Sequence, residues 1–527
     1  MKETYIKVQE SISHEKLLAQ VELICLSPSF QRSGKLSSFL KFIIYQHLNG
    51  KGELIKAYTI ALEVFDRSEN FDPQKDSIVR VYGGRLRKAL ENYYIQKGRE
   101  DDIIIRLPKG RYIPLIRRRD DMLNVETEIK KPTIALIIFD CLNEKERFNY
   151  LANGLSEEIV IGLGKFKELK VIGPLKREYQ HEIGLDVQGI GKKYDAKFLL
   201  EGTLRIKENV LRLTVRLTET NSLEQLWGNV IECDTVNGSI SKFENLIVRN
   251  TVSTLADNYG VISRSIWKDI STHSKEKPTT YEAILRYYNH FIVLTPQSQT
   301  EATLALENAL ANEPKNPLIM AMLGDLMASS FLFGNSDSIT SLQRAKDLAR
   351  RSIALDPNCQ AGHFSLGLVY FLVGEKRMCV MEFESALKLN PNNAHYIASI
   401  SLFLAMAGDW EYGIDLMDRA CEMNPHYPGW HHLVYFMNCY RLGQFEEALI
   451  HANKFNSSDF YWDPLIRAAV LSQLDEKKEM KEALYQLMSL VPDFKQRGRS
   501  MIRRFAFSDS NVDLLWDGLR KAGIDKI

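Results

Sequence analysis

Four basic residues lie close together in the stretch VRVYGGRLRKAL, which covers residues 79–90. They are Arg80, Arg85, Arg87 and Lys88, and their guanidinium and ammonium groups can donate hydrogen bonds to phosphate oxygens and base edges. On a helix, Leu86 and its apolar neighbours fall on one side, whereas Arg80 and Lys88 fall on the other. The stretch therefore predicts a helix that buries one face and presents cations to a polyanion. A solvated basic face without a ligand is the alternative interpretation.

The other candidates surround these residues. Arg85 lies on the flank of the predicted helix, where it could clamp a phosphate backbone, and Arg87 could equally form an ion pair within the protein. Two consecutive glycines interrupt the helix at a cost of about 1 kcal/mol each relative to alanine. For Gly83 we expect tight packing on another helix, and for Gly84, on the outer face, close approach of a ligand.

Charge is unevenly distributed along the chain. Residues 1–120 contain 22 Lys/Arg and 15 Asp/Glu, whereas the complete chain of 527 residues has a net charge of only +1. Between residues 75 and 119 the excess is 13 basic against 5 acidic residues. A basic segment on an otherwise slightly acidic chain favours a nucleic-acid partner.

The elements around the basic helix predict a compact N-terminal domain. Apolar periodicity predicts helices over 13–26, 34–50 and 56–65, and residues 66–76 predict a turn that ends in an acidic helix entry at Asp76. After the basic helix, DDIIIRLPKGRYIPLI (101–116) predicts a β-hairpin whose turn contains Pro108, Lys109 and Gly110. Helices, a basic helix and a basic-tipped hairpin form the layout of a winged helix-turn-helix.

The stretches VRVYGGRLRKAL and RLPKGRYIPL resemble the recognition helix and wing of OmpR/PhoB-type transcription regulators. The wider N-terminal sequence is even more similar to a bacterial group that places such a domain before TolB-like and tetratricopeptide (TPR) segments. It departs from ordinary response regulators in its longer N-terminal helices and in having no receiver domain. The resemblance implies that residues 1–118 bind double-stranded DNA, with contacts from the following residues: Arg80, Gly84, Arg85, Arg87, Lys88, Lys109 and Arg111.

A charged stretch at 119–131 predicts a linker, and residues 132–262 predict an α/β domain. KPTIALIIFD and LKVIGPL read as strands, SEEIVIGLGKF as a helix with Ser156 as its N-cap, and DVQGIGKKY as a short helix. Residues 196–232 alternate apolar and polar side chains through three strands. NGLSEEIVIGL, FLLEGTLR, LRLTVRLTE and LWG resemble the N-terminal α/β domain of TolB-like proteins.

Residues 279–496 contain an internal repeat. Pro314, Pro357, Pro391 and Pro425 each follow a small residue by five positions, and the last three prolines are 34 residues apart, which is the tetratricopeptide period. The unit that ends at Pro357 carries a nine-residue insertion around FLFGNSDSITS. We expect about six units, with capping helices at 497–527. The predicted fold class is multidomain: a winged helix, a TolB-like α/β domain and an all-α TPR superhelix.

Searches for catalytic patterns give no match. In GLDVQGIGK, Ile190 occupies the position where a phosphate loop needs lysine, so the glycines of GLGKF and GIGKKY are expected to pack helices. His426, His431 and His432 are interpreted as part of an inter-repeat loop. Chains of this kind are sometimes associated with nucleotide cyclases, but no second domain with paired metal-binding aspartates is found. We therefore expect no enzyme activity, no cofactor and no bound metal.

The whole-chain features favour a cytoplasmic protein. Seven scattered cysteines without a C-x-x-C pair predict reduced thiols, the N-terminus lacks an apolar signal core, and no apolar run reaches 18 residues, so no membrane contact is expected. The leading hypothesis is a one-component transcription regulator that binds DNA and holds a protein or peptide in the TPR groove, with a homodimer as an arrangement that would suit paired half-sites. The alternative is a TPR scaffold whose winged helix does not bind DNA. DNA binding would weaken steeply with salt, whereas an apolar peptide groove would not.

Overall fold

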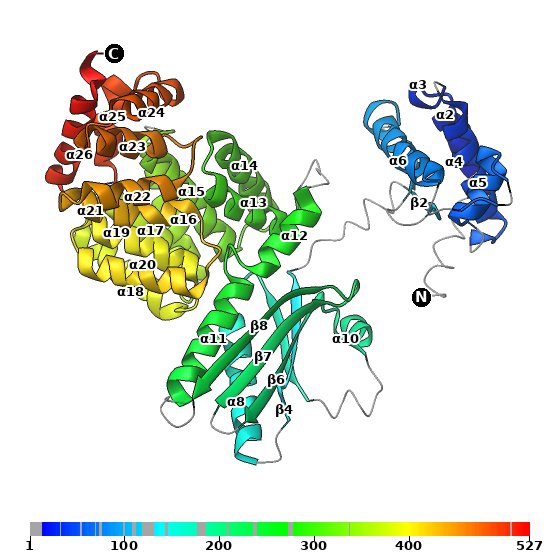
Figure 1. Cartoon of the computed structure of the whole chain (residues 1–527), viewed down its shortest axis with the longest axis horizontal. Coiled ribbons are helices and arrows are strands. Elements are labelled where there is room, and N and C mark those ends of the chain that lie inside the picture. The colour runs from blue at the N-terminus through cyan, green and yellow to red at the C-terminus, as the bar shows by residue number, and fades with distance from the viewer. Residues whose placement is uncertain are drawn as a thin grey trace. The chain divides into compact units, whose positions relative to one another are not determined.

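The computed structural model describes residues 13–31, 33–52, 55–68, 70–72, 76–98, 101–107, 112–118, 131–142, 146–176, 186–207, 210–234, 240–271, 278–336, 338–505 and 508–526. The chain divides into two compact units, Met1–Glu128 and Ile129–Ile527, which are described separately (Figure 1). Within the described ranges, none of the helices has both the length and the apolar character needed to cross a bilayer.

The N-terminal unit consists of helices followed by a hairpin, in the predicted order. Its elements are α2 (His14–Cys25), α3 (Pro28–Gln31), α4 (Gly34–Leu48), α5 (Ala57–Phe65), α6 (Ile78–Gln96), β1 (Ile103–Arg106) and β2 (Leu115–Arg118). The strands β1 and β2 pair antiparallel. Asp76 stands just before α6, at the expected acidic entry: its Oδ1 accepts a hydrogen bond from the backbone N–H of Ile78 at 2.9 Å, whereas Ser77 is the N-cap residue and makes no capping bond with its side chain. Ile24, Phe39 and Leu86 are fully buried in the core that joins α2, α4 and α6.

The second unit begins with a six-stranded mixed sheet in the order β5-β3-β6-β7-β8, with β4 beside β6. Its strands are β3 (Thr133–Ile137), β4 (Asp140–Cys141), β5 (Lys170–Leu175), β6 (Phe198–Lys207), β7 (Val210–Glu219) and β8 (Gln225–Asp234). The strands β6, β7 and β8 are antiparallel, and β3 is parallel to both β5 and β6. Helices α8 (Glu146–Leu163) and α11 (Ile240–Ala256) lie along one face of the sheet (Figure 1). The short helix α10 (Val187–Tyr194) packs Ile190 on Ala135 and Leu199 at the opposite face.

One predicted helix start in this part is wrong. Helix α8 begins at Glu146, so Ser156 is an interior residue and not its N-cap. The Ser156 hydroxyl is buried, donates to the carbonyl of Ala152 and accepts the backbone N–H of Phe139 at 2.9 Å. The serine therefore ties the helix to the end of β3. Gly191 packs closely as expected, because a Cβ there would lie 2.6 Å from Thr220.

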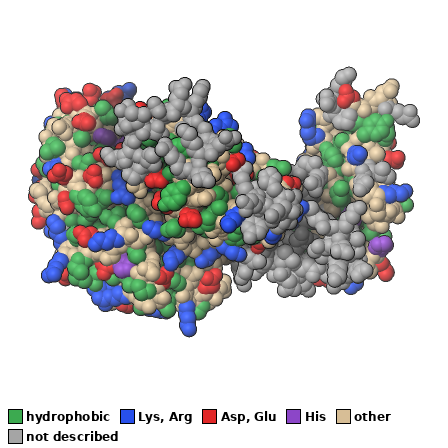
Figure 2. Space-filling view, turned by 90° about the horizontal axis from the view of Figure 1, so that it is seen from below, with side chains coloured by type: hydrophobic (Ala, Val, Ile, Leu, Met, Phe, Trp, Pro, Cys, Tyr) green, Lys and Arg blue, Asp and Glu red, His purple; other side chains and the backbone are tan. Residues whose placement is uncertain are grey.

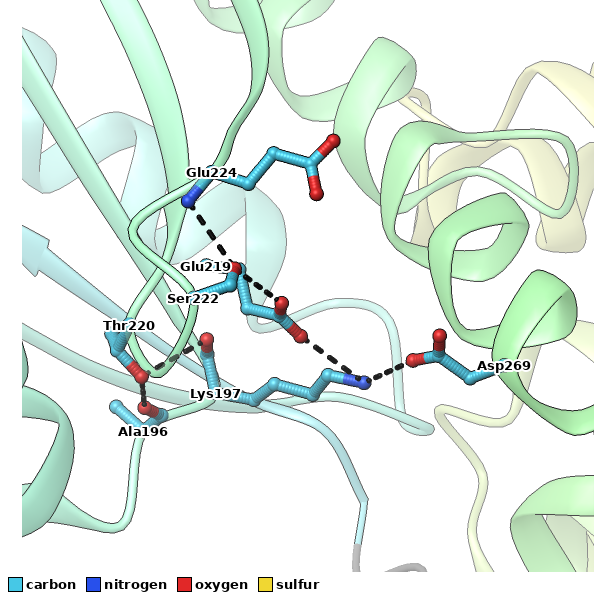
Figure 3. Close-up of polar contacts among 7 residues, drawn as sticks. All are labelled: Ala196, Lys197, Glu219, Thr220, Ser222, Glu224 and Asp269. Atoms are coloured by element: carbon cyan, nitrogen blue, oxygen red, sulfur yellow. Dashed lines mark hydrogen bonds and ion pairs between the residues drawn. The ribbon is translucent and has the colours of Figure 1, made fainter. Parts of the chain in front are cut away.

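The sheet is joined to the rest of the unit through α12 (Val261–Ser271). Lys197, at the start of β6, places its Nζ 3.1 Å from Asp269 of α12 and 3.6 Å from Glu219 of β7. Figure 3 shows this lysine between the two carboxylates. Thr220 fixes the same corner by donating to the carbonyl of Ala196 at 2.7 Å. The ion pair between Lys197 and Asp269 links α12 to the beginning of β6, and the helical repeats follow α12 along the chain.

Six antiparallel helix pairs follow α12 in the described residues, and they form TPR-like repeats (Figure 1). The pairs are α13 (Thr280–Val293) with α14 (Pro296–Asn312), α15 (Pro317–Leu332) with α16 (Ile339–Leu355), α17 (Gln360–Leu372) with α18 (Lys376–Leu389), α19 (Ala394–Met406) with α20 (Trp410–Met423), α21 (His432–Arg441) with α22 (Phe445–Phe455), and α23 (Trp462–Gln473) with α24 (Lys477–Leu490). Helices α25 (Phe494–Arg503) and α26 (Asp509–Ala522) come last. No disulfide joins the seven cysteines, all of which lie in described residues.

The repeats pack as their sequence phase predicts. Gly367 faces Phe383 so closely that a Cβ on Gly367 would lie 2.6 Å from the ring, which brings α17 and α18 together. Ala386 and Ala420 are fully buried on the second helices of their pairs. Small side chains allow two helices to touch, and the proline that follows each second helix prevents its continuation. The regular spacing of small residues and prolines in the sequence therefore corresponds to helix hairpins in the structure.

Candidate functional site

The basic residues of α6 occupy different environments. Arg80, Arg85 and Lys88 are exposed, and the Arg85 guanidinium lies 5.2 Å from the centre of the Tyr82 ring. Arg87 is half-buried, and its guanidinium lies near Gly83. The hairpin residues Lys109 and Arg111 fall outside the described residues. The structure therefore brings three exposed cations together on one helix.

The two glycines of α6 have separate roles. A Cβ on Gly83 would lie 3.0 Å from the ring of Tyr112, so Gly83 lets the segment before β2 pack on the helix. The packing role expected for Gly83 is present, although its neighbour comes from the hairpin and not from another helix. Gly84 is exposed and has open space around its Cβ position. A flat backbone surface is thus available at Gly84.

The inner helices of the repeats are covered on nearly every side. All 13 residues of α19 are buried, as are 11 of the 13 residues of α17 and 10 of the 12 residues of α23. By contrast, α18 and α24 bury 3 of their 14 residues each. A helix that lines an open groove keeps one face exposed. The inner side of the central repeats is therefore closed, which differs from the peptide groove expected from the sequence.

The turn between α11 and α12 covers one part of this inner side. The carboxylate of Asp257 accepts hydrogen bonds from the backbone N–H of His395 at 3.0 Å and from the side-chain amide of Asn424 at 2.9 Å. The hydroxyl of Tyr259 lies 2.7 Å from Nδ1 of His395. All four residues are buried, so the α/β part and the fourth repeat share one buried polar junction.

Helix α13 covers a second part of the inner side of the repeats. Tyr287 donates a hydrogen bond to Asp325 of α15, and Tyr288 donates to Glu168 of the α/β part at 2.5 Å. The Phe291 ring lies 5.3 Å from the ring of His395. The first helix of the repeats therefore contacts α15, α19 and the sheet-bearing part at once.

Residues of the nine-residue insertion contact the C-terminal helices. Arg504, just after α25, donates to the backbone carbonyls of Phe331 and Ser336 at 2.6 and 3.3 Å, and its guanidinium lies 4.2 Å from the centre of the Phe331 ring. Arg497 donates to the carbonyl of Gly334 at 2.9 Å, and the ring of Phe333 lies 5.9 Å from Phe505. We call these contacts between 331–336 and 497–505 the clasp, because they join the second repeat to the C-terminal helices.

Burial shifts the pKa values of two groups in this closed interior. Burial raises the pKa of Asp325 to about 6, although hydrogen bonds from Tyr287 and Ser329 favour its charged form. Burial lowers the pKa of His395 to about 3, so its imidazole is neutral near pH 7. Ionisable groups with shifted pKa values occur at catalytic sites and also in structural networks. Here the two groups tie separate helices together, which is a structural use.

The outer helices present the accessible surface of the repeats. Met381 of α18, Tyr412 of α20 and Tyr485 of α24 are 51%, 40% and 76% exposed. Acidic, basic and hydrophobic side chains are interspersed on the face of the second unit that Figure 2 shows. A shallow cavity of about 400 Å³ also lies between α14 and the end of α15, and Gln299 and Asn335 line it.

The three histidines of the predicted inter-repeat loop do not converge. His431 is buried, with its Nδ1 3.7 Å from Sγ of Cys421, whereas His432 faces His451 of α22. His426 is held by its backbone N–H, which donates to Asn424 at 3.1 Å. A side-chain group that sequence reasoning missed is Cys439, Glu447 and His451, whose spacing of four residues on α22 was the available signal.

Comparisons with known proteins connect parts of this chain to two curated proteins. Over 239 residues the chain is 23% identical to a protein of Rhizobium meliloti (strain 1021) named "Putative adenylate cyclase 3", which is 45% of this chain and 40% of that protein. Over 82 residues it is 27% identical to anaphase-promoting complex subunit 3 of Schizosaccharomyces pombe, which is 16% of this chain and 12% of that protein. The matches thus span less than half of either relative. No protein-family model matches the chain.

Two solved structures show limited similarity to parts of this chain. YrrB, described as a TPR protein with an unusual peptide-binding site, is 16% identical with a TM-score of 0.25, and covers 36% of this chain and 94% of its own. A monomeric mutant of IFIT1 is 13% identical with a TM-score of 0.34, and covers 54% of this chain and 69% of its own. The assignment of TPR-like repeats rests on the helix pairs described above.

Proposed function

We propose that this chain is a protein-interaction scaffold whose helical repeats hold a protein partner. The observation that carries the proposal is the contrast between inner helices such as α19, all 13 of whose residues are buried, and the second helices of the repeats. Helices α18 and α24 bury 3 of their 14 residues each, and α20 buries 5 of 14. A superhelix closed in this way is a rigid support. The accessible binding surface is then the outer face.

The proposed docking surface consists of Met381, Tyr412 and Tyr485, which we call the outer apolar set. Large exposed apolar and aromatic side chains supply much of the binding free energy at protein interfaces. The Schizosaccharomyces pombe relative is by name a subunit of a multiprotein complex, which agrees with a role in assembly. We propose the cytoplasm as its compartment, because seven scattered cysteines without a disulfide in the described residues are usual for proteins of reducing compartments.

The test is quantitative affinity capture with the full chain. A variant with Met381→Ser, Tyr412→Ser and Tyr485→Ser should lose the partner that the unsubstituted chain enriches. Tyr150→Ser, which changes a residue of α8 that is 81% exposed, is the matched control and should retain the partner. Equal capture by the triple variant would refute the outer face as the docking surface. A chain that enriches no protein above the control would refute the scaffold function.

DNA binding through α6 is the second candidate. It is favoured by the exposure of Arg80, Arg85 and Lys88 on one helix and by the open space at Gly84. Each phosphate contact releases counterions, so binding of the full chain to duplex DNA should weaken steeply as salt is raised. Fluorescence anisotropy at two salt concentrations measures this. Arg80→Ala with Lys88→Ala should weaken binding to all sequences, and an unchanged affinity would remove these residues from the interface.

Under both hypotheses, protein scaffold and DNA binding, the α/β part would couple movements of its sheet to the helical repeats. Its turn at Asp257 and its Glu168 are bonded to the repeats, so any ligand that moved the sheet would act directly on α13 and α19. The TolB-like and winged-helix resemblances remain proposals that agree with this arrangement. The resemblance of part of the chain to a named cyclase adds no residue that we can assign to that reaction.

A further inference from the structure

The fifth helix pair contains three potential metal ligands that neither the scaffold nor the DNA hypothesis uses. They are Cys439 of α21 and Glu447 and His451 of α22, and one ligand atom from each lies within 4.8 Å of the other two. Thiolate, imidazole and carboxylate are the donors that proteins use for zinc and related transition-metal ions.

The hairpin explains why these side chains meet. Glu447 and His451 are four residues apart on α22 and therefore project from the same side of that helix. The two helices run antiparallel, with α21 ending at Arg441 and α22 starting at Phe445, so Cys439 near the end of α21 lies beside the first turns of α22. Two helices of one repeat thus supply all three ligands, and the backbone between them is a short turn.

Neighbouring side chains orient the imidazole. Nδ1 of His451 lies 3.1 Å from Nδ1 of His432, and the Tyr435 ring is stacked on the His451 ring with 5.0 Å between centres. A hydrogen bond from a second residue to the ring of a ligating histidine fixes its orientation and supports metal affinity. His432 is therefore a positioning residue for His451.

The three ligands also differ in exposure. Cys439 is 6% exposed, His451 is half-buried and Glu447 is exposed. A metal ion can therefore arrive from the solvent at the glutamate and be held against the thiol and the imidazole. The sulfur and nitrogen donors disfavour Ca²⁺ and Mg²⁺, which take oxygen ligands.

We propose that Cys439, Glu447 and His451 bind a divalent transition-metal ion of the zinc type, with water in the fourth position. On binding, the Cys439 thiol releases its proton to solvent as the metal–sulfur bond forms, so that one H⁺ leaves for each M²⁺ bound. The ion would staple α21 to α22 on the outer side of the fifth repeat. This site is independent of the proposed partner and DNA surfaces.

The test is Co²⁺ binding to the full chain, purified without a histidine tag. Binding is monitored through the near-ultraviolet charge-transfer band that a cobalt–thiolate bond produces. We expect a band that reaches one Co²⁺ per chain and that Zn²⁺ removes by competition. Cys439→Ser should abolish the band. Cys421→Ser is the matched control, because Cys421 also lies beside a histidine, with Sγ 3.7 Å from His431, and it should leave the band unchanged.

Two further variants, one at the exposed Glu447 and one at the buried His432, keep the test sharp if Cys439→Ser fails to fold. Glu447→Gln changes an exposed side chain and should weaken Co²⁺ affinity about tenfold or more, and His432→Gln should weaken it roughly 10- to 100-fold through the orientation of His451. No band in the full chain, a band that survives Cys439→Ser, or an affinity unchanged by Glu447→Gln in the folded protein would overturn the proposal.

Discussion

The clasp between the insertion and the C-terminal helices gives the sharpest prediction about stability. Arg504→Ala removes two hydrogen bonds from a guanidinium to backbone carbonyls and the contact of that guanidinium with the Phe331 ring. A hydrogen bond to a charged group contributes about 1.5–3 kcal/mol, and a cation–π contact about 0.5–1 kcal/mol at exposed sites. The lower ends of these ranges sum to about 3.5 kcal/mol. Because Arg504 is half-exposed and its bond to Ser336 is long at 3.3 Å, we expect a loss of about 2–3.5 kcal/mol in the free energy of unfolding of the C-terminal region.

Hydrogen–deuterium exchange of the full chain, combined with urea unfolding, measures this loss. Exchange should rise in 331–336 and 497–505 and remain unchanged in α19. The neighbouring Arg503 is the matched control: it is 52% exposed and pairs with Asp509 on the surface, so Arg503→Ala should cost less than about 1 kcal/mol. If the two variants lose equal stability and show equal exchange, the clasp does not close the superhelix.

Two further predictions concern the interior. The pKa of His395 is about 3 in the folded state and 6.5 in the unfolded state, so the folded state binds fewer protons between these two pH values. The stability that the neutral imidazole contributes is therefore complete above pH 6.5 and is lost as the pH falls towards 3. In urea unfolding at several pH values, His395→Gln should therefore reduce the slope of the free energy of unfolding against pH by up to about 1.4 kcal/mol per pH unit. An unchanged slope would mean that His395 is protonated in the folded state. Gly367→Ala should destabilise the chain by about 1–3 kcal/mol, because the new Cβ would clash with the buried Phe383, whereas Gly84→Ala, with open space around it, should stabilise α6 by up to about 1 kcal/mol. Thermal unfolding of both variants measures this, and a Gly367→Ala protein as stable as Gly84→Ala would contradict the packing of α17 on α18.

Local patterns in the sequence predict much of this fold. The helices of the N-terminal unit, the strands β6 to β8 and the repeat hairpins follow from periodicity, capping residues and the phase of glycine, alanine and proline. The acidic helix entry at Asp76 and the close packing of Gly191 follow from such local patterns and are present in the structure. Ser156 was misassigned because an N-cap serine and a buried serine that bonds a neighbouring strand look alike in sequence.

The closure of the repeats could not be predicted in the same way. Arg504 is 173 residues from Phe331 and 168 from Ser336, and Asp257 is 138 residues from His395 and 167 from Asn424. Such pairings have no period, so only the folded chain reveals them. The sequence showed the insertion but not that it reaches the C-terminal helices, and it therefore suggested an open groove.

For the candidate sites too, some features could be predicted from the sequence and others could not. Exposure of Arg80 and Lys88 follows from the helical wheel and is present in the structure, whereas a DNA role for them stays a prediction. The Glu447 and His451 pair was visible as a four-residue spacing, but Cys439 joins it only through the hairpin. Histidines that are close in sequence, such as His426, His431 and His432, form the more visible pattern, but they do not converge in the structure.

The measurement that tests the central claim most directly is hydrogen–deuterium exchange of the full chain with and without its captured protein partner. The scaffold account predicts that the partner slows exchange on the second helices α18, α20 and α24, around Met381, Tyr412 and Tyr485, and leaves α17 and α19 unchanged. Slower exchange confined to α6, or slower exchange on α17 and α19 after the clasp has opened, would contradict the outer face as the binding surface.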